Sequence, residues 1–117
     1  MRNFKELKIW QKGFEIATKA YKLTNTFPKE ERFGICFQIN KSAVSIPSNV
    51  AEGNSRSSEK DKSRFIEISL GSAFEMETQL LISAAAGFGN DALRNEMLKD
   101  LDVEQKMLIS FINKLNK

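Results

Sequence analysis

Hydrophobic residues recur at alternating spacings of three and four in the first part of the chain. Between about Phe4 and Thr26 this spacing aligns a set of apolar side chains: Leu7, Trp10, Phe14, Ala17 and Tyr21. Such a pattern is typical of an amphipathic α-helix that buries one face. We therefore expect a first helix with this face in the core, and we expect it to end at the turn before Pro28.

The second segment, from about Pro28 to Glu52, is apolar around more than half of its circumference. Its apolar residues are Phe33, Ile35, Cys36, Phe37, Ile39, Ala43, Val44, Ile46 and Val50. A helix of this kind lies at the centre of a core, or between the core and a neighbouring subunit. Pro47 lacks an N–H group, so it predicts a kink near residues 43–47, with the side chain of Asn49 bonded to nearby backbone.

Two further helices are predicted after the polar loop at residues 53–58. The third helix extends from about Glu59 to Ala86, and its apolar side consists of Phe65, Ile68, Ser72, Met76 and Leu80. The fourth extends from about Asp91 to Asn116, and its apolar side consists of Leu93, Met97, Leu101, Leu108, Phe111 and Leu115. Glu104 interrupts this last face, which we interpret as a position at the rim of the core.

Four helices joined by short turns predict an all-α fold, because short turns force neighbouring helices to run antiparallel. We expect a single up-down-up-down four-helix bundle domain over residues 1–117, with a kinked second helix. The composition agrees, since 6 glycines and 2 prolines are too few for a turn-rich all-β chain of 117 residues.

The residue types that are missing narrow the function. The chain has no histidine and one cysteine, Cys36. Without histidine, Ser-His and Cys-His nucleophile pairs, the usual zinc sites and the Glu-x-x-His di-iron sites of helical bundles are excluded. No glycine-rich phosphate loop is present either. We therefore predict that the protein is not an enzyme and takes no metal, cofactor or small-molecule substrate.

The sequence also bears on location. No apolar segment approaches the roughly 20 residues that a membrane span needs. The first residues lack the apolar stretch of a secretory signal. These two features predict a cytoplasmic protein that makes no membrane contact.

Basic residues are concentrated at the start of the chain. The net charge is only +3 overall, but a helical stripe with mostly three- and four-residue spacing collects six bases: Arg2, Lys5, Lys8, Lys12, Lys19 and Lys22. One interpretation is a solvated face opposite the core. The other is a surface that binds the phosphates of RNA or DNA, for which all six side chains must be exposed on one face. The sequence leaves both interpretations open.

Several motifs resemble one known family. They lie at residues 7–12, 21–24 and 27–28, at residues 43–53 (Ala-Val-Ser-Ile-Pro-Ser-Asn-Val-Ala-Glu-Gly) and at residues 71–80. Together they are similar to the bacterial four-helix bundle proteins encoded in 23S rRNA intervening sequences. The string Ser-Ile-Pro-x-Asn-x-Ala-Glu-Gly is the most specific of them.

The resemblance implies a four-helix subunit that assembles into a ring-like homopentamer. A related branch, the accessory proteins of diversity-generating retroelements, implies a basic pentamer that binds nucleic acid and a reverse transcriptase. The resemblance also singles out residues in and after the second helix: Pro47, Asn49, Glu52, Gly53, Arg56 and Arg64. We expect Gly53 to cap the helix, and Glu52 to form a buried ion pair with Arg56 or Arg64.

Two classes of function follow. The first is a homo-oligomeric accessory protein that binds RNA or DNA through the basic stripe. The second is a structural or scaffolding homo-oligomer that recruits a protein partner through apolar helix surfaces. Both require oligomerisation, because the second helix has more apolar surface than a lone bundle of this size buries.

Overall fold

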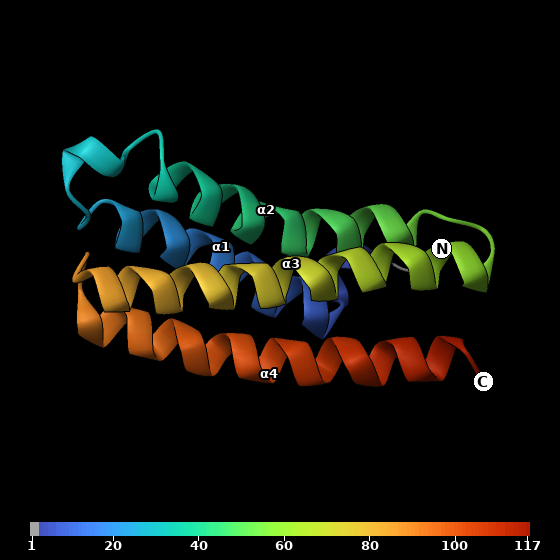
Figure 1. Ribbon diagram of the computed structural model, residues 1–117. Helices are drawn as coiled ribbons and strands as arrows, with labels where there is room; N and C mark the ends of the chain where they lie inside the picture. The colour runs from blue at the N-terminus through green and yellow to red at the C-terminus, as the bar shows by residue number, and fades with distance from the viewer. Residues whose placement is uncertain (1–2) are drawn as a thin grey trace.

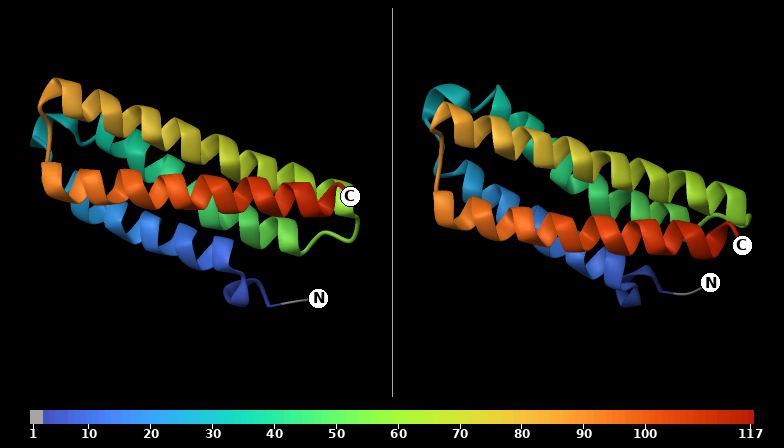
Figure 2. Two further views of the ribbon diagram at one scale, coloured as in Figure 1. Left: turned by 90° about the horizontal axis from the view of Figure 1, so that it is seen from below. Right: turned by 60° about the horizontal axis from the view of Figure 1, so that its bottom comes forward.

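The computed structural model describes residues 3–117, and over these residues it contains helices and no strand. The four α-helices are α1 (Lys8–Thr24), α2 (Ile35–Asn54), α3 (Glu59–Ala86) and α4 (Asp91–Leu115). Two short 3-10 helices, η1 (Phe4–Glu6) and η2 (Lys29–Glu31), precede α1 and α2. Successive α-helices run antiparallel and pack into one elongated bundle of 44 × 22 × 20 Å (Figures 1 and 2). The predicted all-α four-helix bundle is confirmed.

The core face of α1 differs from the predicted one. The buried residues of its central part are Ile9, Gly13, Ile16, Ala20 and Leu23. By contrast, Phe14 and Tyr21 are about half exposed, and Trp10 and Ala17 are partly exposed. Two neighbouring stripes of this helix are apolar and have the same period. The stripe of aliphatic and small residues is buried in the core, and the stripe of aromatic residues lies at the surface. The ring of Trp10 stacks on the outward ring of Phe14, with 5.2 Å between their centroids.

The second helix begins later than predicted. Residues 29–31 form the 3-10 helix η2, and Gly34 has a non-helical backbone (φ −101°, ψ −113°), so α2 starts at Ile35 and not at Pro28. The helix then continues through the buried Pro47, and its ribbon changes direction part-way along its length (Figure 1). The Asn49 amide donates to the carbonyl oxygen of Ser45 at 2.8 Å, which confirms the predicted bond to nearby backbone.

A seam of small polar side chains joins α2 to α3. Its hydrogen bonds connect Ser42 to Glu75 and to Gln79 (3.0 Å each), Ser45 to Ser72 (2.7 Å), and Ser69 to the carbonyl oxygen of Ile46 (2.8 Å). Ser69 is fully buried, and Ser42 and Gln79 nearly so. Because each hydroxyl has a partner, these polar groups are buried without the cost of an unsatisfied donor.

Both ends of α3 are capped, one by a side chain and the other by a glycine. The predicted bounds of α3 are confirmed, and Ser58 caps its first turn by accepting from the amide of Asp61. At its other end Gly87 adopts φ +77°, and Gly89 adopts φ +79° against the ring of Phe27.

The predicted apolar side of α3 is only partly correct. Met76 and Leu80 are buried as expected, but Ile68 is 47% exposed.

Candidate functional site

The bases of the predicted stripe do not form one exposed surface. Lys5, Lys8 and Lys22 are exposed, but the side chains of Lys12 and Lys19 are only 24% and 20% exposed. Arg2 lies outside the described residues. The condition that all six bases share an exposed face is therefore not met by Lys12 and Lys19. Lys5, Lys8 and Lys22 remain available for contact with a partner.

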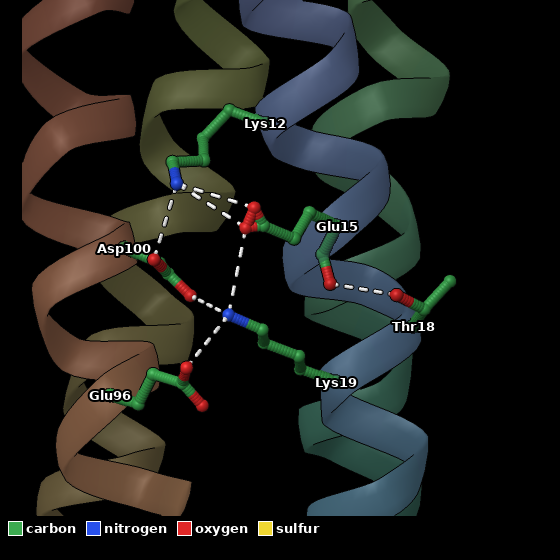
Figure 3. A network of polar contacts seen from close by, with 6 residues as sticks. All are labelled: Lys12, Glu15, Thr18, Lys19, Glu96 and Asp100. Atoms are coloured by element: carbon green, nitrogen blue, oxygen red, sulfur yellow. Dashed lines mark hydrogen bonds and ion pairs between the residues drawn. The ribbon is translucent and has the colours of Figure 1, made fainter.

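Lys12 and Lys19 belong to an ion network that joins the first helix to the last (Figure 3). The Lys12 ammonium lies 3.2 Å from one oxygen of Asp100 in α4, and the Lys19 ammonium lies 2.8 Å from the other. Glu15 contacts both lysines, at 3.3 Å from Lys12 and 3.5 Å from Lys19, and Glu96 lies 3.5 Å from Lys19. These carboxylates neutralise much of the positive charge that the stripe would offer to a polyanion.

The network also affects the titration of the two lysines. The hydrogen bond from Lys19 to Asp100 raises the pKa of Lys19 above its usual 10.5, against the opposing effect of burial. Burial lowers the pKa of Lys12, but the bonds and charges of Asp100 and Glu15 outweigh it, so the pKa is again raised. Both ammonium groups therefore stay charged throughout the ordinary pH range.

Glu104, one helical turn after Asp100 on α4, is fully buried. The prediction of a rim position was wrong. Neither of its carboxylate oxygens has a hydrogen-bond partner among the described residues. Burial raises the pKa of Glu104 from 4.5 to about 8, and the positive charge of Lys12 opposes this only in part. The space for this side chain comes from Gly13, since a Cβ at that position would lie 3.0 Å from a Glu104 oxygen.

The expected buried ion pair of Glu52 does not form. Glu52 lies 4.0 Å from Arg56, and the two side chains are 52% and 43% exposed. Arg64 is also exposed, and it forms no ion pair among the residues described. The guanidinium of Arg56 instead lies over the ring of Phe65, 4.6 Å from its centroid. A pair exposed to this degree contributes little to stability.

Gly53 has a different role from the predicted helix cap. The helix α2 continues past it to Asn54, and Gly53 itself is buried. A Cβ at this position would lie 2.9 Å from the Cβ of Phe65 in α3. The glycine therefore permits the close approach of α2 and α3 near the loop that joins them.

Many large apolar side chains face outward. Eleven of the described residues have this property: Phe14, Tyr21, Phe33, Phe37, Val44, Ile68, Phe74, Leu81, Ile82, Val103 and Ile109. Their exposed fractions range from 41% for Val44 to 85% for Phe33. Sequence analysis missed most of them, because the period of an outward apolar stripe is the same as that of a core stripe.

The described residues show neither a metal-binding cluster nor a helix that could span a membrane. Over residues 3–117, no group of three or more cysteine, aspartate or glutamate side chains is arranged to hold a metal ion. None of the helices in the same range is long and apolar enough to span a bilayer.

Comparison with known proteins places the chain in a family. A solved structure with a TM-score of 0.82 is a protein of unknown function from the S23 ribosomal protein family of Bacteroides thetaiotaomicron. It shares 26% sequence identity, and the alignment covers 89% of this chain and 97% of that one. A search of curated proteins finds no significant match. Residues 5–110 match the sequence model of the 23S rRNA-intervening sequence proteins. The chain therefore belongs to the 23S rRNA-intervening sequence protein family.

Proposed function

We propose that this chain is a non-enzymatic subunit of a homo-oligomer, assembled through the outer face of α3. The observation that carries this proposal is a second stripe on that helix, on the side away from the core. Its members recur at spacings of three and four and are all exposed: Gly71, Phe74, Thr78, Leu81 and Ala85. Alternating large and small residues at this spacing suit the packing of another helix.

The exposure of this face favours an interface over a solvated surface. Phe74 and Leu81 are 47% and 52% exposed, and the neighbouring Ile68 and Ile82 are 47% and 54% exposed. A Cβ at Gly71 would meet nothing within 4 Å, so the helix has open space beside it. Contiguous apolar patches of this kind usually mark contact sites.

Sedimentation velocity tests the proposal. With the homopentamer that the family resemblance implies, the expected particle has about five times the subunit mass of 13.3 kDa. Changing Phe74→Glu and Leu81→Glu together should give monomers, because each buries a charge in an apolar contact. The matched control is Phe14→Glu on α1, which is 52% exposed and should leave the mass unchanged. A monomeric wild-type protein would refute the proposal.

A second candidate function is that of an accessory protein that binds RNA or DNA. It is supported by the exposed Lys5, Lys8 and Lys22, which form no ion pair with a described residue, and by the net charge of +3. In an oligomer these lysines would occur once in every subunit, and phosphate contacts add along a polyanion. The half-buried Lys12 and Lys19 are not part of this revised surface.

Binding measured against salt concentration tests the second candidate. Changing Lys5→Glu and Lys8→Glu should weaken the affinity for RNA and DNA, because two cations that contact phosphates become anions. Both side chains are exposed, so the change should leave the fold intact. The control Lys60→Glu with Lys99→Glu makes the same change in net charge at exposed positions of α3 and α4. If the wild type binds no nucleic acid even at low salt, the scaffolding function takes its place.

A further inference from the structure

Two adjoining hollows lie on the outer side of α1 and α2, next to η2. Both are lined by Tyr21, Arg32, Phe33 and Asn40. The lining of the first also includes Phe37 and Lys41, and that of the second includes Lys29. We call this surface the aromatic–basic groove. It lies where α1 ends and α2 begins, whereas Lys5 and Lys8 lie near the start of α1 (Figure 1).

The local backbone explains why aromatic rings face outward here. The non-helical Gly34 separates η2 from α2, so Phe33 precedes the helix and does not turn toward the core. Its side chain is 85% exposed, and those of Tyr21 and Phe37 are 51% and 57% exposed. Three open rings within one groove have more aromatic surface than solubility alone favours.

The charged side chains that line the groove are all basic, although burial and the nearby carboxylate of Glu31 in η2 raise the pKa of Cys36 in the second hollow. The bases of the groove are Lys29, Arg32 and Lys41, and no acidic residue lines either hollow. None of the three bases forms an ion pair with a described residue, in contrast to Lys12 and Lys19. The guanidinium of Arg32 lies 5.3 Å from the centroid of the Phe33 ring, so a base and a ring are presented together.

This combination decides between the possible occupants. The buried centre of a protein interface is typically poor in lysine, and a second copy of the groove would oppose like charges. Basic side chains interleaved with open aromatic rings are instead typical of sites that bind single-stranded nucleic acid. In such sites the phosphates contact the basic side chains and the nucleobases stack on the rings. A duplex keeps its base faces stacked inside, so the rings would find no partner in it.

The geometry points to the aromatic–basic groove as a binding site for single-stranded RNA or DNA. Nucleobases stack on the rings of Phe33 and Tyr21. The phosphates that link these nucleotides contact Lys29, Arg32 and Lys41. The site shares its class of ligand with the second candidate function above, but it does not involve Lys5 or Lys8.

Fluorescence anisotropy with labelled oligonucleotides tests this site. The probes are oligo(U), oligo(dT) and a duplex, each of about 20 nucleotides per strand, which spans several stacked bases. The wild type should bind both single strands more tightly than the duplex. Changing Phe33→Ala should weaken single-strand binding by roughly 5- to 150-fold, the usual effect of removing one stacking ring. Because Phe33 is 85% exposed, its replacement should leave the fold intact, and circular dichroism checks that the helical content is unchanged.

Two further substitutions separate stacking from simple apolar contact. Phe33→Trp should retain the affinity, whereas Phe33→Leu should lose as much as Phe33→Ala, because leucine has no flat π-face. Arg32→Gln with Lys41→Gln should reduce the slope of log affinity against log salt by about 1.4, since each single-strand phosphate contact contributes roughly 0.7. The control Phe14→Ala removes an exposed ring on α1, outside the groove, and should have no effect.

The outcomes distinguish binding at this groove from binding at Lys5 and Lys8. Equal affinities for Phe33→Leu and Phe33→Trp, or tighter binding of the duplex, would overturn the inference. So would a change in oligomer mass in Phe33→Ala with unchanged affinity, which would assign the groove to a second copy of the chain. If only Lys5→Glu with Lys8→Glu weakens binding, the groove is refuted and the second candidate function stands. Absence of any binding at low salt refutes both.

Discussion

Replacing Glu104 with methionine should make the bundle more stable, and increasingly so as the pH rises. The carboxyl group of Glu104 is fully buried, and neither oxygen has a hydrogen-bond partner among the described residues. Methionine is unbranched, similar in length and without charge, so it fills the same space between α4 and Gly13. The substitution removes both the buried polar atoms and the titration.

The magnitude follows from the shifted pKa. The pKa of Glu104 is raised from 4.5 to about 8, and one pKa unit corresponds to about 1.4 kcal/mol. Between these two pH values the folded chain holds a proton that the unfolded chain has released, so the free energy of unfolding falls as the pH rises. The fall is complete above about pH 8 and amounts to about 5 kcal/mol. About 3 kcal/mol of it has occurred by pH 7.

Urea denaturation followed by circular dichroism measures this effect. From about pH 5 to about pH 9, the wild type should lose about 4 kcal/mol more stability than Glu104→Met. Lys12 and Lys19 do not contribute in this range, because their pKa values are raised above 10.5. The control Glu67→Gln changes an exposed carboxylate on α3 and should keep the wild-type dependence. Parallel pH profiles for the wild type and Glu104→Met would refute the reasoning.

Three other substitutions test the packing by thermal or urea denaturation. Gly13→Ala should lower the free energy of unfolding by about 1–3 kcal/mol, because its Cβ would lie 3.1 Å from Ile46 as well as 3.0 Å from Glu104. An unchanged midpoint would contradict the close approach of α1 to α2 and α4. Gly89→Ala should lower the free energy of unfolding by at least about 1 kcal/mol, because φ is +79° and the ring of Phe27 occupies the space of the new methyl group. A variant as stable as the wild type would be evidence against this turn. Asp100→Asn should lower the free energy of unfolding by about 1–3 kcal/mol near neutral pH. It should also reduce the loss of stability above about pH 10.5, where Lys12 and Lys19 release their protons. A loss of stability above this pH that equals that of the wild type would argue against the network.

Local patterns were sufficient to predict the elements of the fold. The bounds of α3, the continuation of α2 through Pro47 and the bond from Asn49 each depend on residues close together in the sequence. The buried face of α1 was not predictable in the same way. Ile9–Ile16–Leu23 and Trp10–Phe14–Tyr21 have the same period, and only the position of the other helices decides which of the two is buried.

The environment of charged side chains depended on contacts between distant residues. Both interpretations of the basic stripe placed Lys12 on an exposed face, because Asp100, its partner, lies 88 residues away. Glu104 was predicted to lie at the rim because the space that admits it comes from Gly13, on another helix. A glycine inside a helical pattern is the one sequence signal that could have indicated close packing at this point. The aromatic–basic groove was missed because α2 was expected to begin before Phe33.

The serine seam between α2 and α3 has a consequence for how uniquely the two helices pair. Apolar surfaces of similar shape tolerate sliding by one helical turn, about 5.4 Å, with modest loss of contact. The hydroxyls of Ser45 and Ser69 do not, since their partners are Ser72 and one particular carbonyl oxygen. A slip by one turn would leave several buried polar atoms unpaired, at about 1–3 kcal/mol each. The hydrogen bonds of the seam therefore fix the register of α2 against α3. A chain with alanine in place of these serines would sample more than one register.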